Sequence, residues 1–353
     1  MDYKQELSGL LETVVKEGAS DLHLSVGHPP VLRISGALLP LVSSAKLSDE
    51  DLKGFTGELL SGPQKKIFEE TQEVDFSYAY GEKARFRGNG SVASGHPAFA
   101  LRLIPRDLKK IEELNLPPIL KEFANREQGF FLVVGPVGQG KTTTLASLIE
   151  TINEERAEHI ITIEDPIEYL FTEKKSIIDQ REVRIDTKDF HSALTSVFRQ
   201  DVDVVMIGEM REPETISTAV TAAETGHLVF STLHTNNAAQ TIDRIIDSFP
   251  ATQQDQIRLQ LAGSLAGIFS QRLIPRVSGG LIPAYELLIN NNAVSNLIRE
   301  KRTHEINTVI ETGSEDGMID MNRSLAELVR RGEITVENAY TRSWNPKSLE
   351  RLL

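Results

Sequence analysis

Residues 135–142 read GPVGQGKT and stand between an apolar run, FFLVV, and a helix-forming stretch, TTLASLIETI. Their spacing fits the pattern G-x-x-x-x-G-K-[ST]. Glycines let backbone N–H groups curl around phosphate oxygens, and the N-terminus of the following helix adds its dipole. Lys141 is expected to reach the β- and γ-phosphates, and the Thr142 hydroxyl to ligate Mg²⁺. The stretch predicts a site for ATP or a related nucleotide, formed by Gly135, Pro136, Val137, Gly138, Gln139, Gly140, Lys141, Thr142 and Thr143.

Acidic residues follow the apolar strand within HIITIEDPIEYLF, residues 159–171. Glu164, Asp165 and Glu168 come at its carboxyl end, and in a parallel sheet that end faces the ligand crevice. A nucleotide hydrolase needs one carboxylate to orient or deprotonate water and others to hold Mg²⁺. A solvated acidic loop is the alternative that the spacing leaves open.

A second apolar strand ends in acid within DVVMIGEMRE, residues 203–212. Glu209 stands at its end, as in a Walker B strand. Gly208 occupies the preceding position, where many P-loop enzymes have Asp, so Glu164 or Asp165 are candidates to ligate the metal instead. A buried strand with a capping acid is the alternative.

Two histidines and three arginines could also serve the nucleotide. His227 and His234 lie on either side of the predicted strand 228–233, where a histidine can sense a γ-phosphate or only stabilise the fold. The arginines stand outside the P-loop region, and an arginine from another domain or subunit can stabilise γ-phosphate charge. Plain surface positions are the alternative for Arg85, Arg87 and Arg102.

The predicted helices and strands that position these residues divide the chain into an α+β region, a linker and an α/β region. Residues 1–104 predict a small α+β domain, with helices at 2–17, 48–60 and 63–71 and alternating strands such as EVDFSYAY. Residues 105–118 contain three prolines and predict a linker. Within residues 119–353, short apolar strands alternate with helices and predict a parallel, doubly wound α/β sheet. From residue 252 onward the pattern favours mostly helix, at 252–270, 292–300, 303–311, 320–331 and 335–341.

Composition narrows the classes of function. The 353 residues carry a formal net charge of −13, and nucleic-acid binding is not expected because phosphate contacts need clustered Lys and Arg. The chain has no cysteine, which excludes disulfides and Cys-ligated zinc. Neither a signal peptide nor an apolar run of membrane-spanning length is expected. A cytoplasmic protein with at most peripheral membrane association is therefore predicted.

The motifs together resemble one family, the PilT-like retraction ATPases of type IV pili, within the type II/IV secretion ATPase superfamily. The residues that carry the resemblance run from about residue 5 to the C-terminus and occur in this order: ASDLHLS, GPVGQGKTTTLAS, TIEDPIEYLF, DQREV, VFRQDVDVVMIGEMRE, AAETGHLVFSTLHTN, RIIDSFP and SQRLIP.

The resemblance implies a PAS-like N-terminal domain, a RecA-like P-loop core and a homohexamer that hydrolyses ATP with Mg²⁺. Glu164, Asp165 and Glu168 match the family's Asp box, with Glu168 as the catalytic glutamate, and Glu209 matches the Walker B glutamate. The His box matches His227 and His234. Arg87 and Arg102 fall in the region that supplies arginines to the nucleotide site. The implied partner is a platform protein of the inner membrane, with which the motor would associate peripherally from the cytoplasm.

Retraction is favoured over assembly because the chain lacks the extra N-terminal domains and four-cysteine zinc site that assembly ATPases usually have. AVSNLIRE, residues 293–300, is also close to the retraction signature AIRNLIRE, with Ser295 in place of Arg. That difference keeps open a PilU-like accessory retraction ATPase with weak turnover, which would act with a paralogous ATPase. A secretion or DNA-uptake ATPase of the same superfamily is the other alternative.

Overall fold

The computed structural model describes residues 2–34, 36–42, 44–81, 83–104 and 108–353. The chain divides into two compact units, Met1–Asp107 with Glu168–Leu170, and Leu108–Ile167 with Phe171–Leu353. Each unit has its own sheet and its own buried core. Within the described ranges, no helix is both long enough and apolar enough to cross a membrane.

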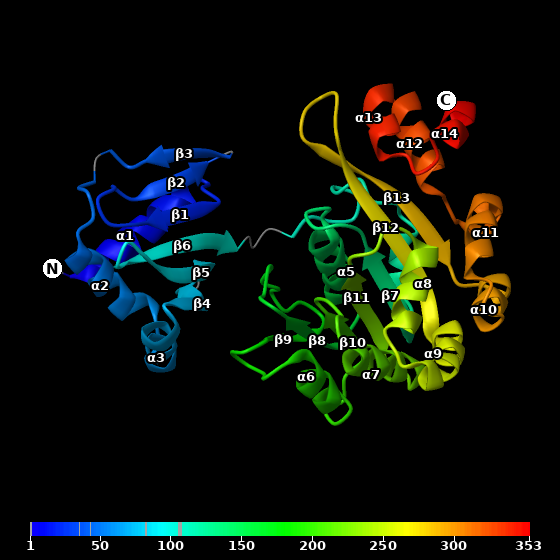
Figure 1. Ribbon diagram of the computed structural model, residues 1–353, viewed down its shortest axis with the longest axis horizontal. Helices are drawn as coiled ribbons and strands as arrows, with labels where there is room; N and C mark the ends of the chain where they lie inside the picture. The colour runs from blue at the N-terminus through cyan, green and yellow to red at the C-terminus, as the bar shows by residue number, and fades with distance from the viewer. Residues whose placement is uncertain (1, 35, 43, 82, 105–107) are drawn as a thin grey trace. The chain divides into compact units, whose positions relative to one another are not determined.

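The first unit is a six-stranded antiparallel sheet with three helices (Figure 1). The strand order is β3-β2-β1-β6-β5-β4. This is the α+β organisation that the alternating strands predicted. Its elements are α1 (Tyr3–Lys16), β1 (Asp21–Leu24), β2 (Val31–Ile34), β3 (Ala37–Pro40), α2 (Asp49–Leu59), α3 (Gly62–Thr71), β4 (Glu73–Tyr80), β5 (Ala84–Ala93) and β6 (His96–Ile104).

Local sequence explains where the helices of the first unit begin and which side they bury. Ser48 caps α2, because its hydroxyl accepts a hydrogen bond from the backbone N–H of Asp51 and the Asp51 carboxylate accepts one from the Ser48 N–H. Helix α1 buries the apolar stripe that the helical period predicted, formed by Leu7, Leu10, Leu11 and Val14. On β5, a Cβ at Gly88 would collide with the ring of Phe76, so glycine there makes room for an aromatic core residue.

The second unit contains a seven-stranded sheet in the order β13-β12-β7-β11-β10-β8-β9 (Figure 1). Neighbouring strands run parallel except for β13, which runs antiparallel to β12. The parallel α/β prediction is confirmed. The strands are β7 (Gly129–Val134), β8 (His159–Glu164), β9 (Ile177–Glu182), β10 (Val204–Ile207), β11 (Leu228–Leu233), β12 (Leu265–Pro275) and β13 (Leu281–Ile289).

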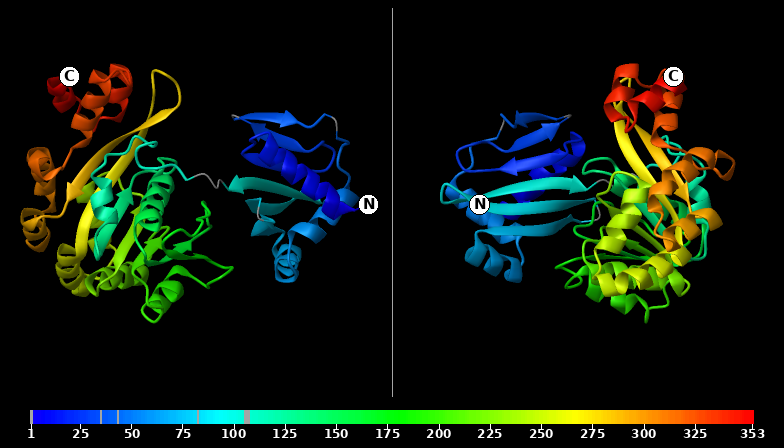
Figure 2. Two further views of the ribbon diagram at one scale, coloured as in Figure 1. Left: turned by 180° about the vertical axis from the view of Figure 1, so that it is seen from behind. Right: turned by 45° about the vertical axis from the view of Figure 1, so that its right-hand side comes forward.

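Helices cover both faces of this sheet (Figure 2). Alternate residues of β7 point to opposite faces, so Phe130 and Leu132 belong to one buried cluster, and Phe131 and Val133 to the other. The first face packs against α6 (Phe190–Val197), α7 (Pro213–Glu224), α8 (Ala238–Asp247) and α9 (Ala251–Ser264). The second face packs against α4 (Leu120–Ala124) and α5 (Lys141–Glu155). All-apolar strands such as FFLVV are what a sheet buried on both faces requires.

The predicted helix 252–270 is wrong from residue 265 onward, and no strand was predicted for residues 271–289. Helix α9 ends at Ser264, and the chain continues directly into β12 and then β13. Residues 265–274 are buried on both sides of β12, except Leu273, so their apolar run has no alternation that would distinguish a strand from a buried helix. Three further elements, β9, α4 and α14, are absent from the prediction.

The segment predicted as a linker is partly packed. Residues 105–107 lie outside the described ranges. Residues 108–118 belong to the second unit, where the side chains of Ile111 and Leu116 are buried beside α4 and α5. The prolines and charges of this segment predict a linker, and they do not indicate that its apolar residues Ile111 and Leu116 pack into a core.

The chain ends in helices that flank the β12–β13 hairpin (Figure 1). They are α10 (Asn292–Arg299), α11 (Ile306–Thr312), α12 (Met321–Arg330), α13 (Val336–Arg342) and α14 (Pro346–Leu352), with short 3₁₀ turns at Thr303–Glu305 and Ser314–Asp316. Helices α12 to α14 bury a small apolar cluster of their own against Ile274 and Ile282 of the hairpin.

Candidate nucleotide site

The phosphate-binding loop lies where the sequence predicted it, between the end of β7 at Val134 and the start of α5 at Lys141. Gly138 and Gly140 have φ values of 76° and 78°, in the left-handed region that glycine tolerates best. Gly140 is the N-cap of α5, so the loop leads its backbone directly into the first N–H groups of the helix. Pro136, Val137 and Gly138 are exposed.

Lys141 is fixed by the loop that precedes it. Its side chain is buried, and Nζ donates to the carbonyl oxygens of Gly135 at 2.9 Å and Pro136 at 3.0 Å. Nζ also lies 3.4 Å from Nδ1 of His234. The ammonium group is therefore held at the mouth of the loop, where a bound phosphate would meet it.

His234 links Lys141 to Glu209, the acid that follows β10. Its Nε2 lies 3.6 Å from Oε2 of Glu209. Because a lysine ammonium can only donate, Nδ1 of His234 accepts and the ring proton lies on Nε2, which faces the carboxylate. Burial, followed by the charge of Lys141, lowers the pKa of His234, so the ring is neutral at pH 7.

Glu209 has a further partner that sequence reasoning missed. Nη2 of Arg211 lies 2.6 Å from Oε1 of Glu209. The side chain of Arg211 is mostly exposed, and that of Glu209 is mostly buried. Lys141, His234, Glu209 and Arg211 thus form a continuous row of polar groups along the carboxyl edge of the sheet. An arginine two residues after a strand-end glutamate was the signal available in the sequence.

Two hydrogen bonds fix the strand ends that carry this row. The Thr232 hydroxyl donates to the carbonyl oxygen of Gly208 at 2.6 Å, and the Ser231 hydroxyl to that of Ile207 at 2.8 Å. They tie β11 to β10 beside the backbone ladder of the two parallel strands. Glu209 and His234, which follow these strands, are therefore held in register with each other.

The acids after β8 lie at the same edge of the sheet, beyond β10. Glu164 is buried, and its Oε1 accepts hydrogen bonds from the Thr162 hydroxyl at 2.7 Å and the Gln180 amide at 3.2 Å. Asp165 faces the guanidinium of Arg184 at 3.5 Å. Glu168 is exposed in the segment that follows. Their sequence-predicted roles in catalysis and metal binding stay predictions.

His227 does not join the row. It precedes β11, whereas His234 follows it, and its backbone carbonyl accepts from the N–H of Gly129 at the start of β7. Its Nδ1 donates to the carbonyl oxygen of Ala222 at 3.1 Å, and its ring packs edge-on against Phe198. Within one chain, His227 lies at the opposite end of the strand from the phosphate loop.

The predicted arginines lie on neighbouring strands of the first unit. Arg87 of β5 and Arg102 of β6 are cross-strand partners, and both are exposed. Nε of Arg102 donates to Asp21 at 2.9 Å, and Nε of Arg85 donates to the Ser77 hydroxyl at 2.6 Å. Arg87 and Arg102 thus present two cations on one surface of that sheet.

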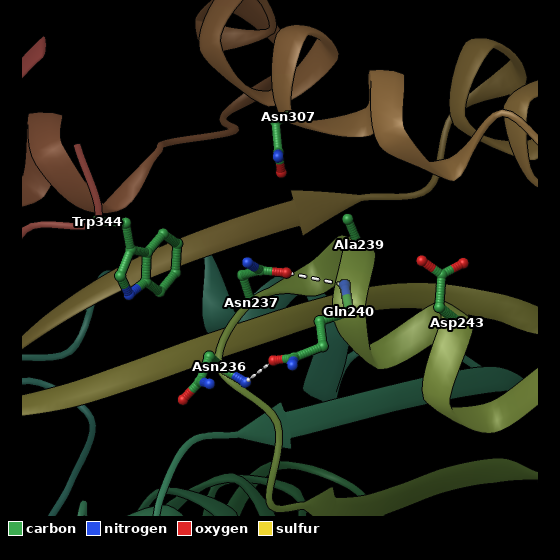
Figure 3. A pocket seen from close by; sticks show the side chains of 7 residues that line it. All are labelled: Asn236, Asn237, Ala239, Gln240, Asp243, Asn307 and Trp344. Carbon is green, nitrogen blue, oxygen red and sulfur yellow. Dashed lines mark hydrogen bonds between the residues drawn. The ribbon is translucent and has the colours of Figure 1, made fainter. Parts of the chain in front are cut away.

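Two cavities flank the loop that joins β11 to α8. One, of about 510 Å³, is lined by His234, Thr235, Arg211 and Arg244 among others. The second, of about 610 Å³, is more open and is drawn in Figure 3, where Trp344, Asn307 and the side chains around the start of α8 surround it. Its wall is fixed by hydrogen bonds from the N–H groups of Asn236 and Gln240 to the side chains of Gln240 and Asn237.

Strand β12 brings two side chains to the phosphate loop that the sequence analysis did not single out. The Gln271 amide bonds the loop and α5, and the guanidinium of Arg272 donates to the Gln271 and Asn236 carbonyl oxygens. Arg272 also stacks over the ring of Trp344, at 5.9 Å from its centroid. The sequence analysis quoted them only within SQRLIP and predicted no strand there, so it gave them no place beside the loop.

Comparison with known proteins gives consistent matches over the chain. The family described as type II/IV secretion system protein matches residues 100–315. The twitching motility protein of Neisseria gonorrhoeae is 44% identical over 91% of this chain and 86% of its own length. The type IV pilus retraction ATPase PilT of Pseudomonas aeruginosa is 41% identical over 97% of this chain and 99% of its own. A crystal structure of the pilus retraction motor PilT with bound ADP superimposes with a TM-score of 0.92 at 45% identity, covering 98% of both chains.

Proposed function

Because the chain belongs to the type II/IV secretion system protein family, we propose that it is a motor that hydrolyses ATP to drive retraction of a type IV pilus. The chain is an ATPase with a RecA-like core and a smaller PAS-like N-terminal domain. The observation that supports the motor proposal best is the row from Lys141 through His234 to Glu209, which links the phosphate loop to a carboxylate.

Three groups of the row, Lys141, His234 and Glu209, each have a role in phosphoryl transfer. Lys141 neutralises charge on the β- and γ-phosphates. Neutral His234 presents its Nε2 proton toward Glu209 and so orients that carboxylate. Glu209, or Glu168 in the segment after β8, accepts the proton of the attacking water. Arg87 and Arg102 of a neighbouring subunit supply positive charge to the transition state.

The residues present fit a magnesium ion. Thr142 places a hydroxyl in the first turn of α5, and Glu164 and Asp165 add carboxylates at the same sheet edge, which are the oxygen donors that Mg²⁺ prefers. The described residues contain no preformed group of three or more metal-binding side chains. This fits an ion held largely by substrate phosphates and water. Magnesium, when bound with ATP, neutralises the charge that develops on the transferred phosphoryl group.

The working assembly is proposed to be a homohexamer that acts from the cytoplasm on a platform protein of the inner membrane. The support is similarity to the retraction ATPases, and it extends to 97% of the chain. Ser295 of α10 favours one alternative, an accessory retraction ATPase that works with a paralogue. Its hydroxyl donates to the Ala262 carbonyl oxygen at 2.9 Å, so it is a partner of α9 rather than a surface charge.

The test is a clean deletion of the gene in its host, read by surface-pilus counts and twitching. Abundant pili without motility are expected if retraction is lost. Bald cells would refute retraction and indicate an assembly role. Unchanged pili and motility would contradict the motor proposal and favour an accessory ATPase or a different filament, which steady-state phosphate release from the purified protein would separate.

A further inference from the structure

Gln271 of β12 bonds the phosphate loop on both sides of Lys141. Its amide nitrogen Nε2 donates to the carbonyl oxygen of Gln139 at 2.8 Å, and its Oε1 accepts from the Thr144 hydroxyl at 2.7 Å. The side chain is 3% exposed. One buried amide therefore ties the last part of the loop and the first turn of α5 to the same point on the sheet.

Gln139 adds a second tie between the loop and the same strand. Its side-chain Oε1 accepts from the backbone N–H of Leu273 at 2.9 Å. The residue lies between Gly138 and Gly140, both of which have positive φ values. A shorter side chain at 139, such as serine, could not reach across to the strand.

The loop glycines make this arrangement possible. A Cβ at Gly135 would lie 2.6 Å from the carbonyl oxygen of Gln271, and a Cβ at Gly140 would lie 3.0 Å from its Nε2. Both glycines therefore let β12 approach the loop from the side away from its exposed tip. This is a packing requirement in addition to their backbone freedom.

We propose that Gln271 and Gln139 are positioning residues that hold the phosphate loop in its nucleotide-binding shape before nucleotide arrives. The proposal rests on the assignment of this loop as the ATP site. Preorganised N–H groups bind an anion more tightly, because the loop already lost its conformational entropy on folding and does not lose it again on binding. Loss of these bonds should weaken nucleotide binding more than it slows the chemical step at saturation.

The experiment measures binding of a fluorescent ADP analogue, together with KM and kcat for ATP, on the full-length protein. The variants are Gln271→Met and Gln139→Ser, which remove the amides. Gln254→Met is the matched control, because Gln254 lies on α9 and its amide donates to the Phe249 carbonyl oxygen at 3.1 Å rather than to the phosphate loop. Thermal unfolding of each variant reports whether it is folded.

We expect Kd and KM to rise about fivefold to tenfold in each amide variant, the effect of losing one or two hydrogen bonds, with kcat within about twofold of wild type. Kd within about twofold of wild type in folded Gln139→Ser would overturn the proposal, even if Gln271→Met proved too unstable to assay. An equal loss in Gln254→Met would overturn it too. Failure of the wild-type protein to bind the analogue would instead overturn the ATP-site assignment itself.

Discussion

Glu286 should make the stability of this protein depend on pH near neutrality. Its side chain is 3% exposed on β13, and Oε1 accepts a hydrogen bond from the N–H of Ala238 at the start of α8. Burial raises the pKa of Glu286 to about 7 from an ordinary value of 4.5, with Asp320 adding to the rise and Arg272 opposing it. The folded protein therefore keeps a proton on this carboxyl over a range where the unfolded chain has lost it.

The sign and size of the effect follow from proton linkage. A raised pKa contributes stability that is fully present below about pH 4.5 and is lost as the pH rises through about 7. At about 1.4 kcal/mol for each pH unit between the two pKa values, the loss is about 3 kcal/mol. Glu286→Gln keeps an oxygen that can accept from Ala238 and cannot ionise, so the variant should escape this loss.

The assay is urea unfolding followed by circular dichroism at several pH values from about 5 to about 8. The free energy of unfolding of Glu286→Gln minus that of wild type should rise with pH by about 2 to 3 kcal/mol across this range. Glu337→Gln, at an exposed position of α13, controls for the removal of one surface carboxylate. A difference that stays constant with pH within about 0.5 kcal/mol would refute the reasoning.

Three substitutions test the site and the first unit. Lys141→Ala should abolish ATP binding measured by calorimetry, because the loop loses its only cation, and full retained turnover would contradict the phosphate-loop assignment. Glu168→Gln should lower kcat far more than the affinity for ATP in a phosphate-release assay, and an unchanged kcat would move the base role to Glu209. Phe86→Ala should lower the free energy of unfolding, measured with a chemical denaturant, by about 3 to 5 kcal/mol, because the ring is fully buried in the first unit. A loss below about 1 kcal/mol would show that this core collapses around the cavity.

Sequence reasoning found the parts of the site that stand at strand ends. Lys141, Glu209 and His234 each follow an apolar run in a βα unit, and parallel strands bring such positions to one edge. Their contacts, such as the 3.4 Å approach of Lys141 to His234, depend on strand order, which periodicity does not give. Gln271 could not be found because it lies inside a strand that is buried on both faces.

The positions of His227 and His234 differ although one motif contains both residues. They are seven residues apart, and β11 takes up the space between them, so a functional pair in the sequence becomes two ends of one strand. Within one chain only the end with His234 faces the phosphate loop, and the role of His227 at the nucleotide site stays a prediction. The alternating pattern placed Arg87 and Arg102 on strands, and the structure adds that they are cross-strand neighbours.

The apolar cluster of α12 to α14 gives the C-terminus a degree of independence. Its members from the sheet are Ile274 of β12 and Ile282 and Ala284 of β13. Ile274, Met321 and Leu325 belong to neither of the two larger clusters of the second unit. A segment with a separate core can open as its own cooperative unit at a lower free energy than the whole protein. In native-state hydrogen exchange the amides of α12 to α14 would then exchange together, ahead of those in β7 and β11.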